Sequence, residues 1–124
     1  MENNSVKKRP QLPETILKNV SSDEEGFQNE VIRPIIKMIS EELKVHVLHQ
    51  FSATKVDFSN LDHLKRKKQL TALIQQNQQF KRELIGMVIG NFNTAELKTY
   101  YPMQKNLNKR ISQIILNRMI DQLA

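Results

Sequence analysis

The sequence predicts an all-α fold, a single compact bundle of about five helices. Apolar residues recur every three or four positions along most of the chain, which is the spacing of one helical face. No run of alternating apolar and polar residues is long enough to give a convincing strand. The 124 residues fit one domain that can bury a core, and 39% hydrophobic and 26% charged residues are ordinary proportions for a folded domain.

The chain is expected to divide near residue 21. Residues 1–21 are predicted to form an N-terminal tail that is partly ordered, because Pro10 and Pro13 disfavour helix at the positions before them. The helical domain is predicted to span residues 22–124.

The first long helix is expected to begin at Ser21 or Ser22, and the spacing from Ser22 to Glu25 is that of a capping box. Pro34 interrupts the helical pattern, because proline lacks a backbone N–H and its ring clashes with the carbonyl of the preceding turn. We therefore expect a kink or break there, with two packed helical pieces at roughly 23–33 and 34–51.

The next two helices are predicted from their caps. Ser59 or Asn60 can cap a helix that runs to about residue 76, and Asn77 can cap the following helix, over 78–91. The first of these helices has only a thin apolar set, which is expected to face the core: Leu61, Leu64, Leu70, Leu73 and Ile74.

Two further helices complete the bundle. Asn93 and Glu96 have capping-box spacing and open a short helix that is expected to end near Tyr100 or Tyr101. Pro102 forces a boundary there, and the last helix follows over about 103–123.

The most apolar run, residues 84–92, carries two of the three glycines of the chain, Gly86 and Gly90. Each Gly inside a helix costs about 1 kcal/mol relative to Ala. The pair therefore indicates that another helix or a ligand approaches the backbone closely, and the aliphatic neighbours favour a helix. We expect this segment at the centre of the bundle, against the helices at 34–51 and 103–123.

Composition excludes several classes of site. The absence of cysteine excludes disulfides, thiolate metal sites and cysteine nucleophiles. A charged N-terminus without an apolar segment behind it, and the lack of an apolar stretch of about 20 residues, predict a cytoplasmic protein that does not enter membranes. No Gly-rich phosphate loop, nucleophile elbow or paired carboxylates are recognisable, so neither catalytic residues nor a cofactor are predicted.

The net charge of +6 is unevenly distributed. Residues 1–57 hold 8 Lys or Arg and 9 Asp or Glu, whereas residues 58–124 hold 11 and 4, a balance of −1 against +7. The basic C-terminal half is compatible with an acidic protein partner, nucleic acid or an anionic surface. A solvated lysine-rich face is the alternative.

Candidate residues for binding nucleic acid or an acidic partner share a positive charge and come from two predicted helices: Lys65, Arg66, Lys67, Lys68, Lys109 and Arg110. Phosphate backbones favour such clusters through counterion release. However, the pattern lacks the tight turn and short paired helices of a helix-turn-helix motif, and no aromatic RNA-binding signature is present.

The histidines offer a candidate metal site. Glu42, His46 and His49 lie at i, i+4 and i+7 and thus on one helical face. They could hold Zn²⁺, with His63 or water completing the shell. The full His-Glu-x-x-His pattern is missing, so solvent-facing or partly buried helix histidines are the alternative.

Three segments together resemble a family of small bacterial proteins of unknown role, some of which carry the label "glyoxalase". They are Gly26-Phe27-Gln28-Asn29 with Arg33-Pro34, the run from Phe80 to Phe92, and Leu107-Asn108-Lys109-Arg110. The resemblance implies a compact helical domain in a bacterial cytoplasm, with no established active site to transfer. Glyoxalase-type metalloenzymes hold their metal on the strands of βαβββ modules, and this sequence predicts no strand series of that kind.

The leading functional prediction is a non-enzymatic protein-interaction or regulatory module that acts through the basic C-terminal half. A nucleic-acid-associated protein is the first alternative, and a metal-dependent glyoxalase-like enzyme is the second. The expected partner is a protein, with nucleic acid as the other choice. Exposed parts of the apolar stripes could also form a homodimer.

Overall fold

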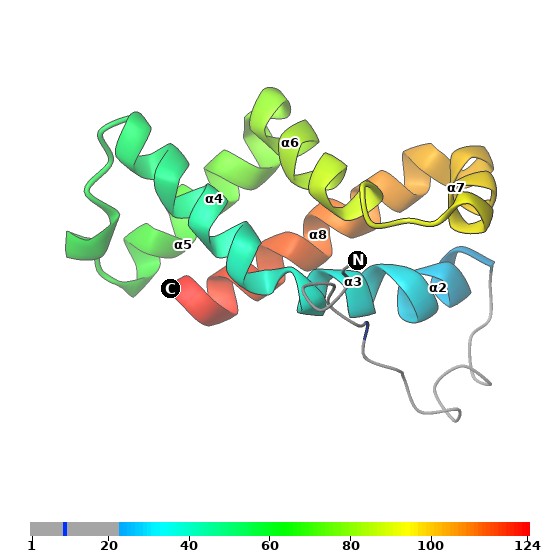
Figure 1. Ribbon diagram of the computed structural model, residues 1–124. Coiled ribbons are helices and arrows are strands. Elements are labelled where there is room, and N and C mark those ends of the chain that lie inside the picture. The colour runs from blue at the N-terminus through cyan, green and yellow to red at the C-terminus, as the bar shows by residue number, and fades with distance from the viewer. Residues whose placement is uncertain (1–8, 10–22) are drawn as a thin grey trace, which may run out of the picture.

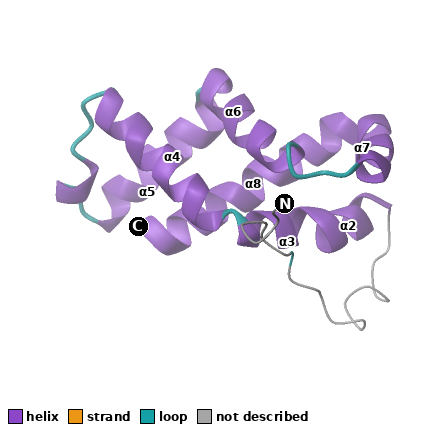
Figure 2. Cartoon of the chain, in the orientation of Figure 1, coloured by secondary structure: helices purple, strands orange, loops and turns teal. Residues whose placement is uncertain are grey.

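A computed structural model describes Arg9 and residues 23–124 of the chain. Within this part the chain forms five helical stretches longer than one turn and no strand (Figures 1 and 2). The prediction of an all-α bundle of about five helices is thus confirmed. The tail expected at residues 1–21, apart from Arg9, and the helix start expected at Ser21 or Ser22 lie outside the described residues.

The helical segments follow one another with short connections. In chain order they are α2 (Asp23–Phe27), the π-helical turn η2 (Gln28–Ile32), α3 (Arg33–Met38), α4 (Ser40–Ala53), the 3₁₀ turn η3 (Phe58–Asn60), α5 (His63–Thr71), the π-helical turn η4 (Ala72–Gln76), α6 (Gln78–Ile89), α7 (Thr94–Tyr100), the 3₁₀ turn η5 (Tyr101–Met103) and α8 (Gln104–Leu123).

The disturbance expected at Pro34 takes the form of a wider helical turn. η2 ends just before Arg33, whose backbone N–H donates to the carbonyl of Gln28, five residues back. Pro34 is the second residue of α3, which continues η2 without a break, so its missing N–H leaves the preceding turn one backbone hydrogen bond short. The helix itself is interrupted at Ile39, with φ −101° and ψ 18°, so the two pieces meet later in the chain than the proline indicates.

The caps expected for α6 and α7 are confirmed. The Asn77 side chain accepts a hydrogen bond from the Phe80 N–H at 3.1 Å. Asn93 and Glu96 form a complete capping box, with reciprocal bonds of 2.8 and 2.9 Å. Each cap supplies an acceptor to backbone donors that have no partner within the helix.

The prediction that Ser59 or Asn60 caps the helix before Asn77 is wrong. Asp62, rather than Ser59 or Asn60, accepts from the Lys65 N–H at 2.9 Å and starts α5. Ser59 and Asn60 lie in η3, where both side chains bond to Asp57. The helix therefore begins later than expected.

The centre of the bundle is α8 rather than α6. α8 contacts α3, α5, α6 and the two π-helical turns, and Figure 1 shows it running from the α7 end of the molecule to the α5 end. Its buried stripe includes Leu107, Ile111, Ile115 and Met119, none of which is accessible to solvent. These side chains belong to the hydrophobic core that the described residues form.

Gly86 of α6 and Gly90 at its C-terminal cap do not mediate close helix packing, so that prediction is corrected. Gly86 and Gly90 are exposed, and a Cβ added at Gly86 would have nothing within 4 Å. Leu84, Ile85 and Val88 face the core instead. The spacing of the glycines does place them on one face, but that face is turned to solvent.

Candidate functional site

Arg66 of the predicted basic set is held inside the fold. Its guanidinium donates to the carbonyls of Ser59 at 2.7 Å, Phe58 at 3.2 Å and Leu123 at 3.4 Å. It also lies 5.4 Å from the centre of the Phe58 ring, a cation–π distance. Arg66 therefore ties η3 and the end of α8 to α5, which engages the donors it would use for a ligand.

Arg110 is engaged in a similar way at the other end of α8. It donates to the Gln28 side chain at 2.9 Å and lies 3.6 Å from the carboxylate of Glu24. These contacts hold α8 against α2 and η2. Both arginines of the predicted set thus have partners within the chain.

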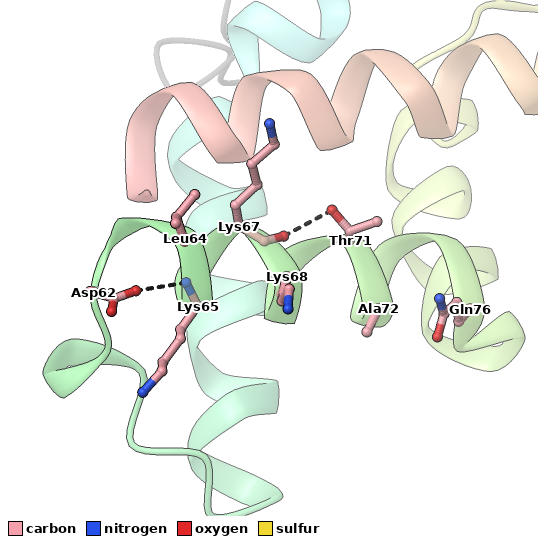
Figure 3. A pocket seen from close by; sticks show the side chains of 8 residues that line it. All are labelled: Asp62, Leu64, Lys65, Lys67, Lys68, Thr71, Ala72 and Gln76. Atoms are coloured by element: carbon pink, nitrogen blue, oxygen red, sulfur yellow. Dashed lines mark hydrogen bonds between the residues drawn. The ribbon is translucent and has the colours of Figure 1, made fainter.

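The lysines of α5 are placed differently. Lys65, Lys67 and Lys68 are exposed, and no ion pair joins them to any residue in the described part of the chain. Figure 3 shows Lys65 and Lys67 leaving α5 in different directions. Their charges are therefore directed to solvent and available to a ligand.

Lys109 does not lie beside the α5 lysines. α5 and its extension η4 run antiparallel to the C-terminal half of α8, because His63 bonds to the Ala124 carbonyl and Gln75 bonds to Gln113. Eleven helical residues separate Lys109 from Lys68 by this path, which is roughly 16 Å at 1.5 Å per residue. The basic set is thus one cluster on α5 and an isolated lysine on α8.

An open pocket of about 720 Å³ follows the exposed side of α5 (Figure 3). We call it the α5 pocket, and it is lined by Asp62, Leu64, Lys65, Lys67, Lys68, Thr71, Ala72 and Gln76. Leu64, expected in the core, is 70% exposed here. An apolar side chain surrounded by lysines is the part of this site that the sequence pattern did not indicate.

A second open pocket, of about 540 Å³, lies along α4. We call it the α4 pocket, and it is lined by Glu41, Glu42, Val45, His46, His49 and Met87. The imidazole of His46 stacks on the Phe80 ring with centroids 5.0 Å apart, and its Nε2 lies 2.9 Å from a carboxylate oxygen of Glu83. His46 thus joins α4 to α6.

The structure does not assemble the metal site that the histidines suggested. Among the described residues, no group of three or more His, Asp or Glu side chains is arranged to hold a metal ion, and this includes Glu42, His46 and His49. His63 lies at the start of α5, where its Nδ1 is 3.0 Å from the carbonyl of Ala124. It therefore does not complete a shell on α4.

Arg9 is anchored at the turn between α6 and α7. Its guanidinium donates to the Glu96 carboxylate at 2.5 Å and also to the carbonyl of Asn91. Burial alone would raise the pKa of Glu96, but hydrogen bonds from Arg9 and from the Asn93 backbone, with the charge of Arg9, hold that pKa below its ordinary value. The ionised carboxylate therefore serves both the capping box and the anchor.

No helix in the described part of the chain is long and apolar enough to pass through a membrane. Comparison with protein-family models, curated proteins and solved structures finds no match to this chain. The resemblance to small bacterial helical proteins therefore stays a prediction, as does a cytoplasmic location.

Proposed function

We propose that this domain is a non-enzymatic protein-interaction module that binds an acidic segment of a partner protein through α5. The observation that carries the proposal is the exposed Leu64 surrounded by Lys65, Lys67 and Lys68 in the α5 pocket. Burying an exposed apolar side chain in a contact is favourable, and the lysines around it favour an acidic partner.

The state of the two arginines supports a protein partner over nucleic acid. Arginine donates bidentately to phosphates and is the preferred side chain for nucleic-acid recognition. Arg66 and Arg110 use their guanidinium groups within the chain. Leu64 has no charged or hydrogen-bonding group that could contact a phosphate backbone.

Nucleic-acid association is the second candidate, and the unpaired ammonium groups of Lys65, Lys67 and Lys68 favour it. Three phosphate contacts would release counterions and make affinity fall steeply with salt. A contact with an acidic protein surface would weaken with salt as well, so nuclease treatment is needed to separate the two candidates.

The test is affinity purification from the native host with and without nuclease. The test variant replaces Lys65, Lys67 and Lys68 by Gln. The control replaces three exposed basic residues on other helices, Lys37, Arg82 and Lys105, by Gln. Both variants carry a net charge of +6 − 3 = +3, so any difference between them reflects position rather than total charge.

The proposal expects a defined protein that is retained by the wild type and by the control, survives nuclease, and is lost with the α5 variant. Equal retention by both variants would contradict it. Loss of the protein after nuclease, together with salt-sensitive binding of labelled duplex DNA or RNA, would establish the second candidate instead.

A further inference from the structure

The α4 pocket has charges opposite to those of the α5 pocket. Three lysines and Asp62 give the α5 lining a formal charge of +2. Glu41 and Glu42 are the acidic groups of the α4 lining, and Glu41 also pairs with Lys44 at 2.6 Å, so these three side chains sum to −1. Because the two surfaces carry charges of opposite sign, each is a suitable electrostatic partner for the other.

Each pocket also presents one strongly exposed aliphatic side chain. Leu64 on α5 is 70% exposed and Val45 on α4 is 68% exposed, the highest values among the large hydrophobic residues of the described chain. Contact between the two would remove both from water, which is favourable in proportion to the apolar area buried.

The α4 pocket is sterically accessible to another helix. Met87 forms its α6 side, and the adjacent Gly86 has no atom within 4 Å of an added Cβ. The backbone of α6 is therefore open to solvent at Gly86, and this residue has no side chain to obstruct a helix lying on α4.

We propose that the chain self-associates head to tail, with the α5 surface of one copy docked on the α4 pocket of a second copy. Leu64 packs against Val45, and Lys65 and Lys68 face the carboxylates of Glu41 and Glu42. This inference names a second copy as the acidic partner and rests on the proposed function of the α5 surface.

The contact is heterologous, because it joins two different surfaces. Such contacts form a ring when the rotation between copies closes and an open filament when it does not. The two patches are small, so the contact belongs with weak interfaces below about 1,200 Å². Its charges are screened as salt shortens the Debye length from about 10 Å at 0.1 M to about 3 Å at 1 M.

The first measurement is sedimentation equilibrium of the full chain over a wide concentration range. The proposal expects the weight-average mass to rise above the 14.5 kDa monomer at low salt and to return toward it at about 1 M salt. A constant monomer mass at low salt overturns the self-association. It leaves the proposed function standing if a different protein is captured through α5 in the purification above.

Charge reversal tests the pairing itself. E41K/E42K makes both surfaces basic, and K65E/K68E makes the α5 surface acidic, so each variant alone is expected to stay monomeric. An equimolar mixture of the two is expected to associate again, since each surface then meets its opposite. Failure of the mixture to associate, with both variants folded by circular dichroism, overturns the proposed pairing. K37E/K105E, reversed at exposed sites elsewhere, is expected to associate as the wild type does.

Cysteine cross-linking then tests the orientation. The chain has no cysteine, so L64C and V45C each introduce the only thiol. Mild oxidation is expected to link the mixed L64C and V45C proteins far more than either protein with itself. Efficient V45C homodimers would instead indicate a symmetric α4–α4 contact and overturn the head-to-tail arrangement.

Discussion

α5 and α8 pack against each other, yet they bury very different shares of their surface. α8 buries six of its residues, whereas α5 buries only Leu70. The exposed face of α5 holds three unpaired lysines and Leu64. On α8, by contrast, Arg110 donates to the Gln28 side chain of the same chain. Stability is therefore concentrated in α8, whereas α5 leaves charged and apolar side chains exposed, where we propose that a partner binds.

The largest expected effect is the difference in stability that results when one apolar residue is truncated on each of the two helices. Ile115→Ala on α8 is expected to lower the free energy of unfolding by about 2–5 kcal/mol, because Ile115 is fully buried and leaves a cavity. Leu64→Ala on α5 is expected to change it by about 0.5 kcal/mol or less. Urea unfolding measures the free energy of unfolding of both variants, and an equal loss of stability in the two would contradict the comparison of α8 with α5.

The next effect is a difference in stability between variants of two neighbouring basic residues of α5, Arg66 and Lys67. Arg66→Ala is expected to cost about 1–3 kcal/mol, since the carbonyls of Ser59 and Phe58 lose their charged donor. Lys67→Ala is expected to be within about 0.5 kcal/mol of the wild type. Thermal and urea unfolding should rank them in this order. An Arg66→Ala variant as stable as Lys67→Ala would mean that Arg66 is free to bind ligands after all.

A smaller and opposite effect is expected at α6. Gly86→Ala should raise the free energy of unfolding by about 0.8–1 kcal/mol, because the site is helical and open. Gly90→Ala is the control and should gain less, as its Cβ would lie 3.2 Å from the Gly86 carbonyl oxygen. A loss of stability in Gly86→Ala would show that another segment packs there.

The smallest effect concerns pH at the α6–α7 turn. The pKa of folded Glu96 is lowered, so its contribution to stability is present above its ordinary value of 4.5 and is lost as pH falls through the lowered value. Glu96→Gln keeps a capping-box side chain but cannot ionise. The stability advantage of the wild type over this variant should shrink below about pH 4.5. Parallel stability–pH curves for the two proteins would contradict the role of Arg9 as its partner.

Features that depend on neighbouring residues could be predicted from the sequence, whereas features that depend on distant contacts could not. The caps at Asn77 and Asn93 could be predicted because a capping side chain and its donor lie within three residues. The interruption at Ile39 could not, since Pro34 is accommodated by a π-helical turn that has no clear sequence signature. Asp62 was missed because Ser59 and Asn60 are equally good cap residues.

The site was predicted only in part for the same reason. A run of four basic residues must expose some of its charges, and three of them are exposed on α5. Which one turns inward depends on carbonyls as distant as that of Leu123, 57 residues from Arg66. The exposure of Leu64 likewise depends on how α8 lies over α5, which helical spacing alone does not determine.

The bonds from His63 and Arg66 to the end of α8 have a practical consequence for spectroscopy. They place the carbonyl of Ala124 at the first turn of α5, next to the lysine cluster. Ala124→Cys would introduce the only thiol of this sequence, and a fluorophore attached there would lie beside the α5 pocket. Its polarisation and emission would then report when that surface is occupied, without altering any residue of the helix.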